Sequence, residues 1–259
     1  DTMIMDLDSG ISLNDGGLKA FHDDGSGEGV DVDFMPVSDN GYTFKVSGWD
    51  RSRPLRIDPI VYATFIGGMH SDSSTGMAVD DNGDFYLTGY SNSLNYPVTQ
   101  DGYSGMNSGI MDGIISKMDS TGSNLMYSTF FGGSDLDQLF DIEMDPDGGF
   151  WAVGHTKSDD IPTSDNAFND TRNGSEHDIM ILKFDSTGTT LEYSSYLGGT
   201  ASDTFLGNRV LAVDSDGNAV FAGKTSSDNF PMTDDAYDSS FGMMTWEKGF
   251  ITKIDPTSS

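Results

Sequence analysis

One seven-residue pattern occurs three times in this chain, and this repetition limits what the chain can fold into more than any other feature. It reads Tyr-Ala-Thr-Phe-Ile-Gly-Gly at residues 62–68, Tyr-Ser-Thr-Phe-Phe-Gly-Gly at 127–133 and Tyr-Ser-Ser-Tyr-Leu-Gly-Gly at 193–199. The copies follow at intervals of 65 and 66 residues. A period of this length predicts an array of one supersecondary unit.

Further landmarks recur in the same order between the copies. Each unit contains an acidic turn, a glycine that ends a strand, a pair ending in proline, and a closing Lys-x-Asp. The acidic turns are 80–83, 145–148 and 214–217, the glycines are Gly89, Gly154 and Gly223, the proline pairs are 96–97, 161–162 and 230–231, and the Lys-x-Asp segments are 117–119, 183–185 and 253–255. The whole unit is therefore repeated, not only its most visible motif.

Each unit is predicted to contain four short strands. In the first copy they are expected at 76–79, 84–89, 113–118 and 125–131, with Asn82-Gly83 as the turn of a hairpin. No apolar pattern with helical spacing persists along the chain, so the fold class is all-β. Four-stranded antiparallel units at this spacing fit the blades of a β-propeller. A β-sandwich is the structural alternative, whereas the coils of a β-solenoid are shorter than this unit.

Several segments resemble the SBBP repeat of bacterial and archaeal surface proteins, a family named for a seven-bladed β-propeller. The matching segments are 78–80, 112–113 with Lys117, 212–214 with 217–218, 230–231 and 249–253. The resemblance covers about residues 60–259 and implies three repeats, at about 60–124, 125–190 and 191–259. One departure is Lys248, which stands where the first two repeats have Asp112 and Asp178.

The repeats are preceded by a different region. Segments 42–46 and 50–59 resemble the end of the β-rich domain that often leads into such propellers, so we expect a domain boundary between residues 58 and 59. Three blades are too few for a closed ring, which typically has four to eight. We therefore expect an incomplete ring, with a fourth-strand segment at 60–66 available to complete a blade. Further blades of a longer protein, the first 58 residues or partner chains would supply the rest, and we favour a longer protein.

The charge of the chain excludes several kinds of partner. It has 13 Lys and Arg against 42 Asp and Glu, a net charge of −29. Nucleic acid is excluded because phosphate binding needs clustered basic residues, and an anionic membrane surface is disfavoured for the same reason. No apolar stretch approaches the roughly 20 residues of a membrane span, so no membrane insertion is expected in this segment. The absence of cysteine removes disulfides and thiolate sites.

The acidic turns are the candidate metal sites. Their oxygen-bearing residues alternate as in the first half of a calcium loop, although the bidentate Glu of such a loop is missing. Ca²⁺ is accordingly the one cofactor considered. The alternative is that Asp, Asn and Gly are present because hairpin turns require them. The candidate ligands are Asp80, Asn82 and Asp84 in the first repeat, Asp145 and Asp147 in the second, and Asp214, Asp216 and Asn218 in the third.

No catalytic motif is present, and the chain is not expected to be an enzyme. None of its four histidines has a metal-ligand spacing, and there is no nucleophile elbow, phosphate loop or dinucleotide fingerprint. Two glycosylation sequons, at Asn169 and Asn173, lie in one long connection. Two sequons within seven residues favour a secreted glycoprotein.

These features together predict an extracellular, cell-surface structural or adhesive propeller protein that self-assembles into a filament or surface layer. Its expected partners are other copies of itself or cell-surface polymers. The alternative function is that of an extracellular carbohydrate-binding lectin or a propeller enzyme.

Overall fold

A computed structural model of the chain describes residues 4–6, 19–22, 26, 28–38, 41–58, 63–205, 207, 209–242 and 246–257. Within these residues the chain forms 17 strands and no helix, as expected for an all-β protein. The described part thus holds no helix that could cross a membrane. The chain divides into two compact units, Asp1–Thr64 and Phe65–Ser259.

The first unit contains one antiparallel sheet of five strands. Their order in the sheet is β1-β4-β3-β2-β5. The strands are β1 (Ile4–Asp6), β2 (Lys19–His22), β3 (Gly29–Ser38), β4 (Gly41–Ser47) and β5 (Leu55–Asp58). This sheet occupies the region in which the sequence predicted the end of a β-rich domain.

The second unit consists of three antiparallel sheets, one for each repeat, which we call blades 1 to 3. Blade 1 contains β6 (Asp72–Val79), β7 (Phe85–Ser91), β8 (Asp112–Met118) and β9 (Leu125–Phe131). Blade 2 contains β10 (Asp137–Met144), β11 (Phe150–Thr156), β12 (Asp178–Phe184) and β13 (Leu191–Leu197). Blade 3 contains β14 (Asp203–Thr204), β15 (Leu211–Val213), β16 (Ala219–Thr225) and β17 (Lys248–Ile254).

Blade 3 differs from the other two in its first strand. Both β14 and β15 pair with β16, so together they replace the single first strand of blades 1 and 2. The interruption coincides with an insertion, because Asp203 and Asp214 are three residues further apart in the sequence than Asp137 and Asp145. The final strand β17 therefore corresponds to β8 and β12, and pairs with β16 alone among the described residues.

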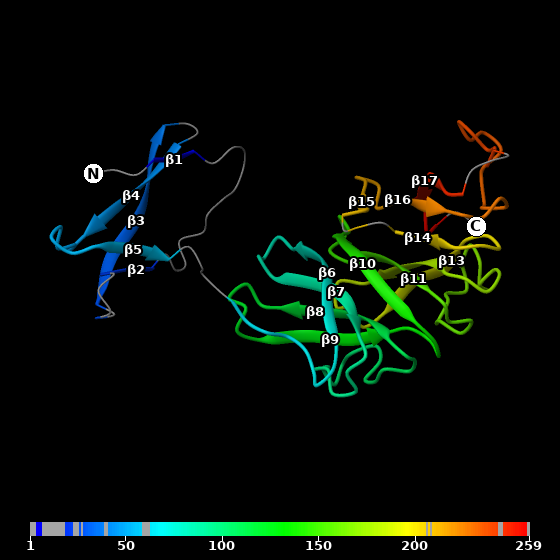
Figure 1. Ribbon diagram of the computed structural model, residues 1–259, viewed down its shortest axis with the longest axis horizontal. Helices are drawn as coiled ribbons and strands as arrows, with labels where there is room; N and C mark the ends of the chain where they lie inside the picture. The colour runs from blue at the N-terminus through cyan, green and yellow to red at the C-terminus, as the bar shows by residue number, and fades with distance from the viewer. Residues whose placement is uncertain are drawn as a thin grey trace. The chain divides into compact units, whose positions relative to one another are not determined.

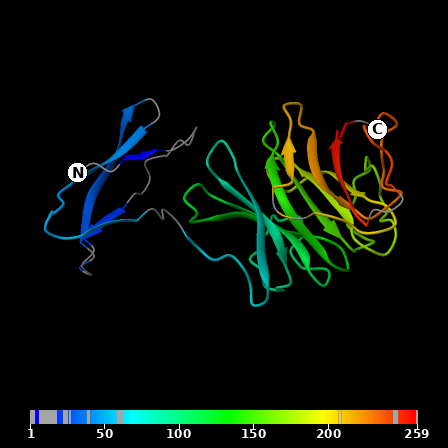
Figure 2. The same cartoon turned by 45° about the horizontal axis from the view of Figure 1, so that its top comes forward.

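The three blades stack face to face in chain order (Figures 1 and 2). Apolar layers lie between them. The layer between blades 1 and 2 includes Phe131 and Phe184, whose rings meet edge to face at 6.2 Å. The layer between blades 2 and 3 includes Trp151, Phe221 and Phe250. Burying each such ring contributes roughly 1.5–3 kcal/mol, so these layers are the main source of stability. Among the described residues the blades do not close into a ring.

The predicted fourth-strand segment at 60–66 does not form a strand where the structure describes it. Residues 59–62 lie outside the described part, and 63–68 have no strand pairing. The reason is that the following residues are fixed to blade 1: Gly68 N donates to Asp72 Oδ2 at 2.7 Å, and His70 N donates to Ser93 Oγ at 2.8 Å. Ile66 also packs on the outer face of blade 1. Among the described residues, no third strand of a preceding blade lies beside the segment, so the segment has no strand to pair with.

Candidate functional site

The acidic turns connect the first two main strands of each blade, where the sequence placed them. Glycine is required there, because Gly83, Gly148 and Gly217 have φ angles of 80°, 86° and 82°. In the first turn, Asp80 Oδ1 accepts hydrogen bonds from the backbone N–H groups of Asn82 and Asp84, at 2.9 and 3.0 Å. The carboxylate thus stabilises the turn itself.

A lysine of the third strand binds the first aspartate of every turn. The distances between the ammonium nitrogen and the carboxylate oxygen are 3.0 Å for Lys117–Asp80, 2.8 Å for Lys183–Asp145 and 2.5 Å for Lys253–Asp214. Burial alone would raise the pKa of Asp80, but its bonds to Lys117 and to backbone N–H groups hold that pKa below its usual value. The repeated Lys-x-Asp and the repeated acidic turn are therefore two halves of one contact.

The candidate calcium ligands consequently lie in separate turns whose first carboxylate already faces an ammonium group. The turns of blades 2 and 3 do come together around a cavity of about 380 Å³, lined among others by Asp147, Lys183 and Asp216. In the described part of the chain, no group of three or more His, Asp or Glu side chains lies close enough together to hold a metal ion. Calcium binding by the turns stays a prediction.

The sequence analysis missed a further repeated aspartate, four residues after each Gly-Gly. Its Oδ2 atom accepts a hydrogen bond from the second glycine, at 2.7 Å in blades 1 and 2 and 2.8 Å in blade 3. A serine at the end of the second strand donates to the same oxygen, as Ser158 does to Asp137 at 2.7 Å. The three aspartates are Asp72, Asp137 and Asp203. A repeated Gly-Gly-x-x-x-Asp was visible in the sequence and could have revealed them.

A second set of buried aspartates begins the third strand. Asp112 and Asp178 are 1% and 0% exposed, and each faces the aspartate that begins the next blade. Burial, together with the charge of Asp137, raises the pKa of Asp112 to about 6. Burial and the charge of Asp203 likewise raise the pKa of Asp178 to about 7. In these interblade carboxylate pairs, Asp112–Asp137 and Asp178–Asp203, the Oδ1 atom of every aspartate is buried without a hydrogen-bond partner.

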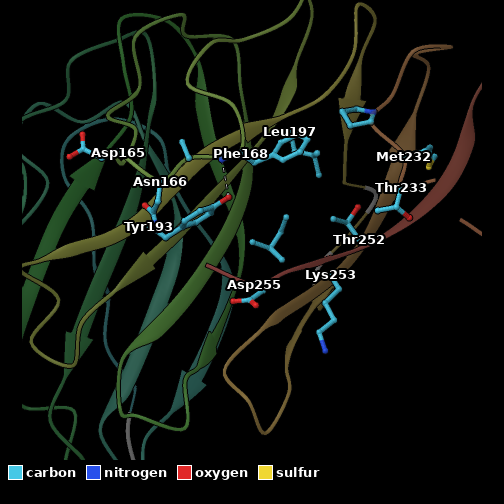
Figure 3. A pocket seen from close by; sticks show the side chains of 13 residues that line it. Asp165, Asn166, Phe168, Tyr193, Leu197, Met232, Thr233, Thr252, Lys253 and Asp255 are labelled. Atoms are coloured by element: carbon cyan, nitrogen blue, oxygen red, sulfur yellow. Dashed lines mark hydrogen bonds between the residues drawn. The ribbon is translucent and has the colours of Figure 1, made fainter. Parts of the chain in front are cut away.

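A groove of about 580 Å³ lies between blades 2 and 3, beside β17 (Figure 3). We call it the blade 3 groove. Blade 2 contributes Phe168, Tyr193 and Leu197, and blade 3 contributes Met232 and Thr233 together with residues 252–255 of β17 and its end. Most of its lining is apolar.

The two sequons lie against the fourth strand of blade 2. Asn169 accepts a hydrogen bond from the Thr171 hydroxyl through Oδ1 at 3.2 Å. Asn173 donates from Nδ2 to the carbonyl of Gly198 at 3.2 Å, so a glycan on this atom would have to displace that bond. Both asparagines are half-buried, and glycosylation stays a prediction at both.

His155 is a buried group of blade 2, whereas its neighbour His177 is half-buried. The rings of His155 and His177 lie 4.5 Å apart, and His155 Nε2 lies 3.0 Å from Gln138 Oε1. Burial, together with the nearby groups His177 and Lys157, lowers the pKa of His155 to about 3. A neutral imidazole packed on Phe140, at 4.7 Å, serves packing here.

Stacked four-stranded antiparallel sheets that repeat one sequence pattern define a β-propeller repeat protein. A comparison with protein families agrees, since residues 61–97 match the SBBP family, described as a beta-propeller repeat. The chain therefore contains an SBBP beta-propeller repeat at residues 61–97. The matched segment spans the fourth-strand segment, the first hairpin of blade 1 and its Tyr96-Pro97 pair. A comparison with curated proteins gives no match.

Proposed function

We propose that this protein is an extracellular, non-enzymatic structural or adhesive protein of the cell surface whose copies assemble through blade 3. The observation that carries the proposal is the exposure of Ile251 in β17. This side chain is 80% exposed, whereas Ile115 and Ile181, at the same position of β8 and β12, are fully buried. An apolar side chain exposed at a position that the fold otherwise buries indicates a contact surface.

The blade 3 groove supports a strand as the occupant. In blade 2, Ser164 holds the fourth strand by donating N–H to Ser194 O at 3.1 Å and accepting from Ser194 N at 3.0 Å through its hydroxyl. Thr99 and Ser128 make the same contacts in blade 1. Thr233, their counterpart in blade 3, lines the groove. A strand added to the edge of β17 would gain both main-chain and hydroxyl bonds.

The segment 62–66 of a second copy is the occupant we propose. It has the pattern of β9 and β13, which occupy this position in blades 1 and 2. Its Phe65 side chain is fully exposed. The segment cannot reach β17 of its own chain, because residues 68–71 are bonded to blade 1 and blade 2 lies between. A second copy supplies the same sequence without this restraint.

The polar residues of the repeats support a non-enzymatic role. The repeated lysines bind the acidic turns, and the aspartates after Gly-Gly bind backbone and serine groups. These repeated polar side chains therefore stabilise the blades.

The sequons at Asn169 and Asn173 and the net charge of −29 support an extracellular location.

Light scattering of the purified full chain after size-exclusion chromatography tests this function. We expect oligomers whose mass grows with protein concentration, with and without calcium. Ile251→Lys should give a monomer, whereas Met106→Lys, at an exposed methionine in a loop of blade 1, should assemble like the unaltered chain. A peptide of residues 61–68 should compete with assembly. A persistent monomer at all concentrations would overturn the proposal.

A further inference from the structure

The interblade carboxylate pairs lie where two successive blades meet. Asp112 and Asp178 begin the third strands β8 and β12, while Asp137 and Asp203 begin the first strands of the next blades. All four side chains are at most 1% exposed. The same pair therefore occurs at both interfaces between the three blades.

Each pair converges on the first glycine of a Gly-Gly. A Cβ atom on Gly132 would lie 2.7 Å from Asp137 Oδ2 and 2.9 Å from Asp112 Oδ1. A Cβ atom on Gly198 would lie 2.7 Å from Asp178 Oδ1 and 2.8 Å from Asp203 Oδ2. The two carboxylates of a pair thus approach one small volume from opposite blades.

One oxygen of each carboxylate is satisfied by the backbone. Asp112 Oδ2 accepts from Ser108 N at 2.6 Å, and Asp178 Oδ2 accepts from Asn173 N at 2.8 Å. The Oδ1 atoms of all four aspartates are buried without a hydrogen-bond partner. Burial raises the pKa of Asp137 and of Asp203, although the Thr156 and Thr225 hydroxyls act in the opposite direction. Asp112 Oδ1 and Asp178 Oδ1 are unpartnered oxygens that lie beside Gly132 and Gly198, where the two carboxylates of each pair converge.

Two buried carboxylates with unsatisfied oxygens are costly unless a cation accompanies them. We propose that each interblade carboxylate pair binds one Ca²⁺ ion, which joins two successive blades. Ca²⁺ prefers carboxylate and carbonyl oxygens in flexible geometry, whereas Mg²⁺ demands a nearly ideal octahedron. One divalent ion neutralises both carboxylates of a pair. The site differs from the acidic turns, where a lysine ammonium already faces the first aspartate.

Blades 1 and 3 each provide a natural comparison. Asp72 of blade 1 makes the same bonds to Gly68 and Ser93, but no aspartate of a preceding blade faces it in the described residues. In blade 3, Lys248 stands in place of Asp112 and Asp178. The described part of the chain therefore contains two complete pairs.

Calorimetric titration of the full chain with CaCl2, after treatment with a chelator, tests the proposal. We expect two Ca²⁺ ions per chain and a rise of Tm by several degrees at saturation, because the ion binds only the folded state. The double variant Asp112→Asn, Asp178→Asn should lose both effects while remaining folded without calcium. Asp72→Asn alters the aspartate of blade 1, which faces no second aspartate among the described residues. This variant should therefore keep both the two bound Ca²⁺ ions and the rise of Tm.

Two further outcomes would overturn the proposal. Asp147→Ser with Asp216→Ser alters only the acidic turns, so loss of the calcium response in this variant alone would place the ions there. If calcium leaves Tm unchanged while acidification from about pH 7 to about pH 5 raises the Tm of the chelated chain, each pair holds a proton and no metal ion.

Discussion

At the scale of single residues, the repeated Lys–Asp contact has different surroundings in each blade. The side chains of Lys183 and Asp145 in blade 2 are 14% and 1% exposed, and those of Lys253 and Asp214 in blade 3 are 54% and 29% exposed. Lys183→Met should lower the free energy of unfolding by about 3–5 kcal/mol, because it leaves a buried carboxylate without its cation. Lys253→Met should cause no measurable change, since water screens that pair. Urea unfolding of both variants measures the difference, and equal losses would contradict the role of burial.

His155 is the residue that should make the protein sensitive to mild acid. Its pKa of about 3 in the folded state lies below the usual value of 6.5, mainly because burial disfavours the charged ring. The stability that depends on the neutral ring is complete above about pH 6.5 and is lost as the pH falls toward 3. Between about pH 7 and pH 4, the unaltered chain should lose about 2–3 kcal/mol relative to His155→Phe. The difference in unfolding free energy between the two proteins isolates this effect from the carboxylates, and a difference that does not vary with pH would refute it.

At the scale of elements, a β-bulge in the first strand requires a glycine at the opposite position of the second strand. In blade 2 the register of β10 shifts between Leu139 and Asp141, and Gly154 of β11 lies opposite Leu139. A Cβ atom on Gly154 would stand 2.1 Å from the carbonyl oxygen of Gln138. Gly154→Ala should therefore cost about 1–3 kcal/mol, as overpacking does. Gly105→Ala meets nothing within 4 Å and should be nearly neutral in the same denaturation measurement. Equal costs would mean that the bulge does not constrain this position.

The strands were predictable from the sequence because their signals are local. Hairpin turns and short β-prone runs predicted four strands in the first repeat, and these are β6 to β9. Glycine at 89 and at 154 was recognised as a landmark, but the bulge that requires it depends on pairing with the preceding strand. The fourth-strand segment at 60–66 was expected to be a strand from its resemblance to β9 and β13, yet a strand forms only beside a partner.

The pairing of buried aspartates across two blades could not be predicted, for the same reason. Asp112 and Asp137 are 25 residues apart in the sequence and belong to different blades, and only the stacking of those blades brings them to Gly132. Composition showed many aspartates and directed attention to the turns, where the alternating pattern is visible. The acidic turns are held by lysines from the third strand, a contact that joins two landmarks found separately in the sequence.

At the scale of the whole molecule, charge opposes the packing of the blades. With 42 acidic and 13 basic residues, most carboxylates have no basic side chain available to them anywhere in the chain. The apolar layers between the blades and the local bonds of the aspartates must therefore overcome a general repulsion within the folded protein. Because this repulsion acts between many exposed charges, dissolved salt should weaken it more than it weakens the buried lysine contacts.

Raising NaCl from about 20 mM to about 500 mM should accordingly increase Tm by several degrees, because the screening length falls from roughly 20 Å to less than 5 Å. KCl should act equally, since screening depends on ionic strength and not on the identity of the cation. At about pH 4, where many carboxylates are protonated, the same change in salt should have a smaller effect. Thermal unfolding followed by circular dichroism, in the presence of a chelator, provides the measurement. A Tm that falls with salt at neutral pH would show instead that ion pairs such as Lys183–Asp145 outweigh the general repulsion.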